Sequence, residues 1–285
     1  MQKGYFKAAW GDIRQSEGWL GKVFLLGLIS LIPIFGQVVL LGYAFGWMRD
    51  IAWNAKTPLP ARIFGNEDGQ LYRRGLIVLA IDIVFCVVAP GVVEGCWNAL
   101  AGRGLDTVSG AVFGGPGHLF SGQVSSVFGL LISLIAAVFY LVAATRASIY
   151  GRLGPGFQLG RLWAMMRHDP KGLARVVLMG VVMTLCVMAV LGVAVAAVAA
   201  GAAVVGAFGA LGSGGVASAM ALMLFVMLAV VLCLVAAVVV SAASAFISLM
   251  VARAMGYWVQ QFDVPAWRGQ DDPMPFEVAS GGMPR

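Results

Sequence analysis

The sequence predicts an all-α protein: a polytopic bundle of transmembrane helices. Of its 285 residues, 60% are hydrophobic and only 11% are charged, and the mean hydropathy is +0.90. A soluble domain carries about 25% charged residues, so a soluble α/β or all-β enzyme is excluded, as is a disordered chain. The apolar residues also form runs of the roughly 20 residues that a helix needs to cross a bilayer.

Residues 6–13 are predicted to belong to an amphipathic helix that lies in the membrane interface. One face of this helix carries four apolar side chains at helical spacing, namely Phe6, Ala9, Trp10 and Ile13. Trp10 and Arg14 are expected to anchor it at the level of the lipid headgroups. Ser16 follows as the candidate N-cap of the next helix.

The first apolar run, residues 20–48, allows three arrangements: one long bent helix, a hairpin that turns at 33–36, or a re-entrant pair. The positive-inside rule helps to choose between them. With a turn at 33–36, 18 of the 19 basic residues fall on one side and only Arg103 on the other; one continuous span gives 14 against 5. The charges therefore favour a turn, with both chain termini cytoplasmic, but they do not separate the hairpin from the re-entrant pair.

Four further spans follow, for a total of about six membrane segments: residues 75–93, 124–145, 173–200 and 220–251. A stretch rich in Gly, Ala and Ser at 206–215 breaks the helix between the last two. Residues 1–262 are therefore expected to form one integral membrane domain. Residues 263–285 are expected to form a polar, flexible cytoplasmic tail.

A shift of 153 positions aligns the two halves of the chain and predicts a parallel internal repeat with units starting near residues 5 and 157. The shift superposes Trp10 on Trp163 and Arg14 on Arg167. Residues 159–166 then form a second interfacial amphipathic helix, with Trp163 and Arg167 as its anchors. Asp169 is the candidate N-cap of the span that follows, and Pro170 its first helical residue.

Asp82 is the candidate functional residue within the membrane, because it is the only ionisable residue at the centre of a predicted span. A charged group at that depth costs about 2.5–3.5 kcal/mol and is expected to face protein or water. Two interpretations remain open. Asp82 is either a protonatable site or cation ligand, or a hydrogen-bonded carboxyl that fixes helix packing.

Hydroxyl residues within the spans are assigned to helix packing, because small polar side chains let transmembrane helices approach closely. These are Thr184, Ser241, Ser244 and Ser248. The proline-containing loop at 58–62 is expected to be a solvated linker, with docking of a partner or of anionic headgroups as the alternative.

No motif predicts an enzyme, a cofactor site or a metal site. The two histidines have no second ligand at metal-site spacing, and the four cysteines share no CxxC spacing. The net charge of +6 follows from basic residues at span ends, so nucleic-acid binding is not expected.

Several short motifs resemble a prokaryotic family of integral membrane proteins, domain-of-unknown-function family 4013. They are Gly18-Trp19-Leu20, Leu31-Ile32-Pro33-Ile34, Gly42-Tyr43, Trp47-Met48-Arg49, Pro58-Leu59-Pro60, Arg74-Gly75-Leu76 and Gly256-Tyr257. The resemblance covers the chain up to about Phe262 and implies a six-segment membrane protein. It supplies no substrate and no catalytic residue.

The sequence therefore favours a non-enzymatic scaffold or accessory subunit of a cell (inner, cytoplasmic) membrane. Its expected partners are the lipid bilayer and either another membrane protein or a second copy of the chain. The alternative is a small transporter or channel that uses Asp82.

Overall fold

The structure, a computed structural model, describes residues 4–55, 57–64, 69–100, 127–211 and 216–262. Every regular element within these residues is helical, which confirms the all-α class. Four helical segments are long and apolar enough to cross a membrane: Leu71–Cys96, Leu131–Tyr150, Pro170–Gly201 and Val226–Gln260. The count of about six segments stays a prediction, and the tail at 263–285 lies outside the described residues.

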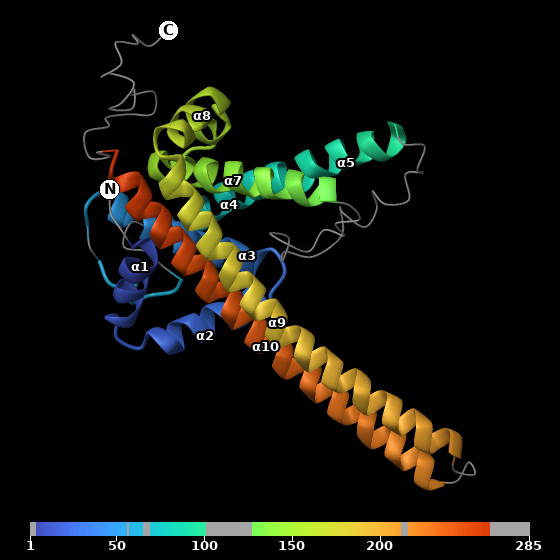
Figure 1. Cartoon of the computed structure of the whole chain (residues 1–285). Coiled ribbons are helices and arrows are strands. Elements are labelled where there is room, and N and C mark those ends of the chain that lie inside the picture. Colours follow the sequence, from blue (N-terminus) through green and yellow to red (C-terminus); the bar gives the residue numbers. More distant parts are fainter. Residues whose placement is uncertain (1–3, 56, 65–68, 101–126, 212–215, 263–285) are drawn as a thin grey trace, which may run out of the picture.

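The first three helices belong to a body from which two long helical hairpins project (Figure 1). They are α1 (Tyr5–Arg14), α2 (Trp19–Ser30) and α3 (Phe35–Ala52). The chain turns between α2 and α3 at residues 31–34, around Pro33, so one continuous helix over 20–48 is wrong. At 12 residues, α2 is about 18 Å long, well short of a 30 Å hydrocarbon core. This length favours the re-entrant arrangement over a full hairpin.

The first projecting hairpin pairs a composite helix with α7 (Val127–Tyr150). The composite runs through α4 (Leu71–Asp82), the π-helical turn η1 (Ile83–Val88) and α5 (Ala89–Leu100). Pro90 explains the wider turn, because its ring would clash with the carbonyl four residues earlier in a regular α-helix, that of Cys86.

The second hairpin is formed by α9 (Pro170–Leu211) and α10 (Val216–Gln260), after the 3₁₀ turn η3 (Gly154–Phe157) and α8 (Leu159–His168). The predicted start of a helix at Pro170 is confirmed. Because α9 continues to Leu211, the first part of the predicted break, residues 206–211, is helical. Residues 212–215 lie outside the described residues. Both hairpins leave the same side of the body and diverge in Figure 1.

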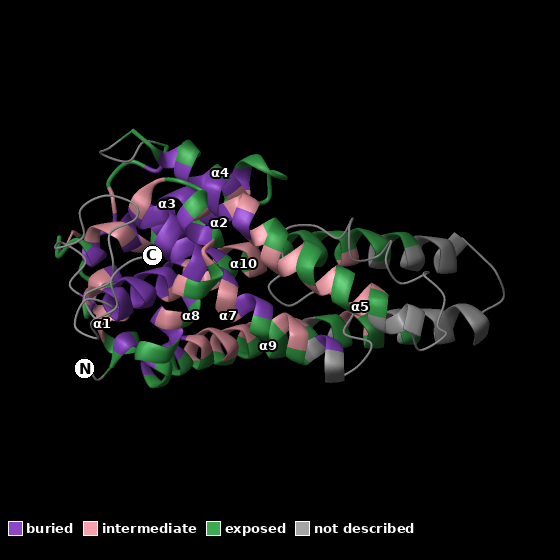
Figure 2. Cartoon of the chain, turned by 90° about the horizontal axis from the view of Figure 1, so that it is seen from above, coloured by how far each residue is buried: buried purple, intermediate pink, exposed green. Residues whose placement is uncertain are grey.

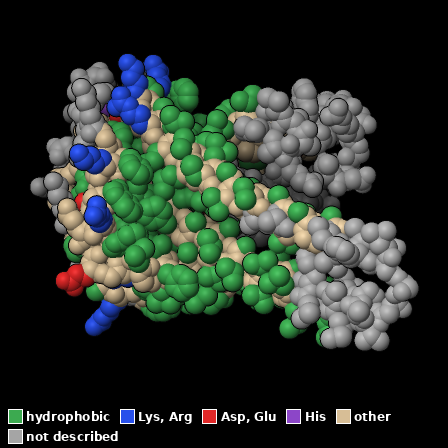
Figure 3. All heavy atoms as spheres, turned by 60° about the horizontal axis from the view of Figure 1, so that its bottom comes forward, with side chains coloured by type: hydrophobic (Ala, Val, Ile, Leu, Met, Phe, Trp, Pro, Cys, Tyr) green, Lys and Arg blue, Asp and Glu red, His purple; other side chains and the backbone are tan. Residues whose placement is uncertain are grey.

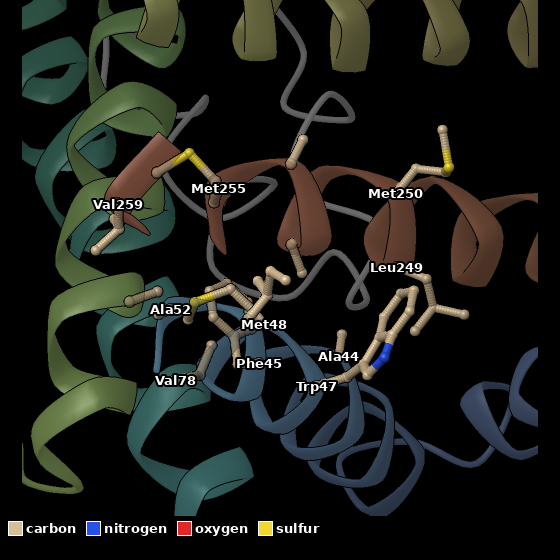
Figure 4. Packing of buried hydrophobic residues seen from close by; sticks show 14 of the residues in the cluster. Ala44, Phe45, Trp47, Met48, Ala52, Val78, Leu249, Met250, Met255 and Val259 are labelled. Carbon is tan, nitrogen blue, oxygen red and sulfur yellow. The ribbon is translucent and has the colours of Figure 1, made fainter. Parts of the chain in front are cut away.

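The core of the body lies where α3 crosses the last turns of α10. Figure 4 shows side chains of α3, among them Phe45, Trp47 and Met48, packed against Leu249 and Met255 of α10. Figure 2 shows buried residues concentrated in the body and exposed ones along the hairpins. The hairpins therefore present their apolar surface outward, as helices surrounded by lipid do.

Glycines set the closest helix crossings. A Cβ on Gly75 would overlap the carbonyl oxygen of Val38, and one on Gly42 would overlap that of Leu71, so α3 and α4 touch backbone to backbone at two reciprocal points. Gly27 of α2 meets the backbone of Ala242 of α10 in the same way. Small residues at such positions let membrane helices pack without side chains between them.

The two hairpins differ in length relative to a bilayer. Along the first, Arg74 and Glu94 are about 30 Å apart at 1.5 Å per residue, close to one hydrocarbon thickness. No charged residue separates Arg175 from Arg253 in the second hairpin, and Arg175 lies about 54 Å from the end of α9. The second hairpin is therefore longer than one hydrocarbon thickness, a mismatch that membrane helices accommodate by tilting, kinking or locally thickening the bilayer.

Charged and apolar side chains are separated along the molecule. Figure 3 shows Lys and Arg side chains over the body, while hydrophobic side chains cover the described parts of the hairpins. The predicted duplication has one structural counterpart: both proposed units open with a ten-residue helix, α1 and α8. The duplication itself, and the single domain over 1–262, stay predictions.

Candidate functional site

Arg253 of α10 is the centre of a polar cluster inside the body, and its side chain is completely buried. Its Nε donates to Oδ2 of Asp12 on α1 at 2.7 Å, and its Nη1 donates to the carbonyl of Trp47 at 2.9 Å. The guanidinium lies over the Trp47 ring, 4.3 Å from the centroid. Tyr257, one turn later, donates to the same Oδ2 of Asp12 at 2.7 Å. The cluster thus ties α1, α3 and α10 together.

A short non-helical segment, residues 57–60, is fixed to the body by its backbone; we call it the strap. Its carbonyl oxygens accept hydrogen bonds from Trp47 Nε1 (3.0 Å) and Arg253 Nη2 (3.1 Å), both at Thr57. Lys22 Nζ donates to Leu59 (3.2 Å) and the Tyr43 hydroxyl to Pro60 (2.8 Å). The side chain of Leu59 is buried. The expectation of a solvated linker is therefore wrong for residues 57–60, because side-chain donors of the body bind their carbonyl oxygens, whereas Ala61 and Arg62 are exposed as expected.

Ser16 does not cap α2, contrary to prediction. The helix begins at Trp19 with Gly18 as its N-cap, and no side chain caps it. The Ser16 hydroxyl instead accepts the N–H of Leu59 at 2.8 Å and donates to the carbonyl of Asp12 at 2.9 Å. It joins α1 to the strap.

Asp169 caps α9, as predicted: its Oδ1 accepts the N–H of Gly172 at 2.9 Å. The side chain is buried, and its Oδ2 accepts from Gln261 at 2.8 Å. Burial, followed by the nearby carboxylate of Asp169, raises the pKa of Tyr5 on α1. Asp169 therefore connects α9, α1 and the end of α10.

Asp50, near the end of α3, lies beside the Arg253 cluster. Burial raises the pKa of Asp50 above its ordinary value, and the hydroxyl of Thr57, which donates to its Oδ2 at 3.2 Å, lowers it in part, as do nearby arginines. Burial likewise raises the pKa of Tyr43. These groups, like Arg253 and Asp12, were missed from the sequence; the available signal was the i, i+4 spacing of Arg253 and Tyr257 beside a span end.

Asp82, the predicted intramembrane site, ends α4 directly before the π-helical turn. Cys86, one turn later, hydrogen-bonds to its carboxyl group. The carboxyl group also lies within electrostatic range of Tyr140, a buried side chain of α7, the helix that packs against α4. Asp82 is half-buried, as a group that is expensive to expose to lipid is expected to be.

The predicted packing residues occupy different surroundings. Ser241 donates to the carbonyl of Val238 at 3.0 Å within α10, next to the crossing of Gly27 with Ala242. Ser248 and Thr184 are half-buried, and Ser244 is exposed. Ser241 therefore lies beside a close helix crossing, and the packing role of the other three stays a prediction.

The two tryptophans predicted as interfacial anchors have different surroundings. Trp10 packs edge-to-face on Trp19 and Phe246, with ring centroids 5.4 and 5.7 Å apart, whereas Trp163 is exposed. Arg14 and Arg167 are both exposed at the ends of their helices. Among the described residues, no group of three or more His, Cys, Asp or Glu side chains could hold a metal ion.

Comparison with known proteins identifies a family. The model of a family described as "Protein of unknown function (DUF4013)" matches residues 25–200, more than half of the chain. The matched region runs from α2 to the middle of α9 and includes the strap and Asp82. Neither the curated proteins nor the solved structures yielded a match.

Proposed function

We propose, from the premise that the chain belongs to the DUF4013 family, that it is a non-enzymatic scaffold or accessory subunit of a prokaryotic cytoplasmic membrane. In this proposal it crosses the bilayer several times and keeps both termini in the cytoplasm. The partner is another membrane protein or a second copy of the chain.

One observation carries the proposal: a body held together by buried hydrogen bonds joins two hairpins whose outward surfaces are apolar. Buried hydrogen bonds from Arg253, Ser16 and Asp169 hold the body together. No charged residue interrupts the second hairpin between Arg175 and Arg253. A base held together by buried hydrogen bonds, with apolar helices projecting from it, is suited to holding other membrane helices.

Cross-linking in native membranes tests the scaffold role. Full-length tagged protein is cross-linked in intact cells, purified, and its partners are quantified against an unrelated multi-pass protein at the same abundance. A partner, or a second copy, at a fixed ratio to the chain is expected. Recovery at the level of the unrelated protein would argue against a scaffold.

The proposed topology has its own test. Because both termini are assigned to the cytoplasm, a fluorescent protein that matures only in the cytoplasm should fluoresce when fused after Arg285. An alkaline phosphatase that folds only outside should be active when inserted next to Arg103, the single basic residue on the predicted outer side. The opposite pair of signals would invert the topology.

The second candidate function, a small transporter or channel, is favoured by the position of Asp82 directly before a π-helical turn, a feature frequent at functional sites. Purified protein in liposomes is assayed for proton and monovalent cation flux. Flux should appear with the unmodified chain and vanish in Asp82→Asn, while Asp50→Asn serves as a control in the body. Equal flux in both variants and the parent would refute this candidate.

A further inference from the structure

We propose that α8 and the turn before it bind the headgroups of anionic lipids at the surface of the bilayer. The inference rests on the membrane location proposed above. It concerns one surface, called here the α8 face. Its apolar members are Leu153, Phe157, Leu159 and Trp163, and its basic members are Arg152, Arg167, Lys171 and Arg175, all of them exposed.

The side chains of α8 differ in exposure from one side of the helix to the other. Leu162, Met165 and Met166 are buried against the body. On the adjoining flank, Leu159 and Trp163 are 56% and 54% exposed, one turn apart, and Arg167 follows one turn later. A flank that passes from aliphatic to Trp to Arg matches the change from acyl chains to headgroups across a membrane interface.

Aromatic contacts fix this face to the first projecting hairpin. Phe157, just before α8, stacks on Phe85 of the π-helical turn with centroids 5.9 Å apart, and Phe85 stacks on Phe139 of α7 at 6.4 Å. These contacts hold the turn before α8 against the first projecting hairpin, so the exposed flank of α8 keeps a fixed position beside that hairpin.

Charge decides which lipid suits the face. Lys171 and Arg175 continue the basic surface along α9, and Leu178, in the next turn, is again apolar and exposed. Asp169 is the only acidic residue between 152 and 178, and it is buried and hydrogen-bonded to Gly172 and Gln261. The face is thus strongly positive, and a soluble anion would leave Leu159 and Trp163 uncovered, whereas an anionic bilayer covers both parts.

Lipid-specific quenching tests the inference on the full-length protein. The chain is reconstituted in phosphatidylcholine vesicles that contain brominated phosphatidylglycerol or brominated phosphatidylcholine. The contribution of Trp163 is obtained by subtracting the signal of Trp163→Phe, an exposed position where the smaller ring is expected to leave folding intact. Carbonate extraction of the native membranes is run in parallel.

Trp163 should be quenched more by the anionic brominated lipid than by the zwitterionic one. Arg167→Gln/Lys171→Gln should lower that preference by up to about 30-fold, about fivefold for each charge. The matched control Arg62→Gln/Arg73→Gln removes two exposed arginines elsewhere on the body and should leave it unchanged. In the unmodified chain, 1 M salt should reduce the preference as well.

Two results would overturn the inference alone: no quenching of Trp163 by either lipid in a chain that resists carbonate extraction, or equal quenching that neither the double variant nor salt alters. Release of the chain by carbonate would instead overturn the membrane location, and this inference with it.

Discussion

Arg253 on α10 donates its Nε–H to Oδ2 of Asp12 on α1 at 2.7 Å, a contact between residues 241 positions apart. The arginine is wholly buried and the aspartate is only 20% exposed. Because both partners also hydrogen-bond to other groups, the pair closes the body by linking its first helix to its last.

Removing one partner of this pair should destabilise the protein. Arg253→Gln leaves Asp12 without its cation, and Asp12→Asn leaves a buried guanidinium; each should lower the free energy of unfolding by about 3–5 kcal/mol. Thermal unfolding in detergent measures the loss. The double variant should lose less than the sum of the two, and strict additivity would mean that the pair is not coupled.

Gly75→Ala should separate α3 from α4, since the added methyl would overlap the carbonyl oxygen of Val38. Overpacking of this kind costs about 1–3 kcal/mol, read as a lowered midpoint of thermal unfolding. Gly21→Ala is the matched control, because a Cβ at Gly21 of α2 meets nothing within 4 Å. Equal midpoints for the two variants would contradict the crossing.

Ser16→Ala and Asp169→Ala should both destabilise the chain, for different reasons. Asp169→Ala removes the N-cap of α9 and should cost about 0.5–2 kcal/mol. Ser16→Ala leaves the buried N–H of Leu59 unsatisfied and should cost about 1–3 kcal/mol. Hydrogen exchange distinguishes them: Ser16→Ala should expose the amides of the strap, and Asp169→Ala those of the first turn of α9. The same pattern in both variants would contradict the two roles.

Asp50→Asn should stabilise the protein increasingly as pH rises. Burial raises the pKa of Asp50 from its ordinary 3.8, so the folded chain holds this proton more tightly than the unfolded chain. Above about pH 4 the unfolded state loses the proton first, and the stability of the parent falls with pH until the folded carboxyl also ionises. Asn carries no such proton, so its advantage should grow between pH 4 and 7.5.

Unfolding midpoints at the two pH values check this prediction, with Thr57→Val as a companion. That variant removes the hydroxyl that hydrogen-bonds Asp50, so the pH effect should widen in it. An advantage of Asp50→Asn that is the same at both pH values would contradict the prediction.

Local signals in the sequence predicted the helices and several of their ends. Pro33 marks the turn between α2 and α3, and Asp169-Pro170 marks the start of α9, because a proline without an N–H and a capping carboxylate act within one turn of chain. The all-α class followed from composition alone, since apolar runs of this length have one stable form in lipid.

Long-range contacts were not predictable in this way. Ser16 carries the same local signal as Asp169, yet its hydroxyl bonds Leu59, 43 positions away. The sequence of the strap predicts a solvated loop, because nothing in it indicates the side chains that donate to its carbonyl oxygens. The structure shows these donors to be Trp47, Tyr43 and Arg253. The half-buried position of Asp82 likewise depends on how α4 packs against α7.

The strap has a consequence for how the chain tolerates change. Its partners Trp47, Tyr43, Lys22 and Arg253 contribute side-chain donors, while the strap contributes main-chain oxygens that every amino acid possesses. Tolerance to substitution should therefore differ between the two sides of these hydrogen bonds: many residues could replace Pro60, whose side chain makes none of them, but few could replace the donors. A saturation library should accept more substitutions at Pro60 than at Tyr43, Trp47 or Arg253.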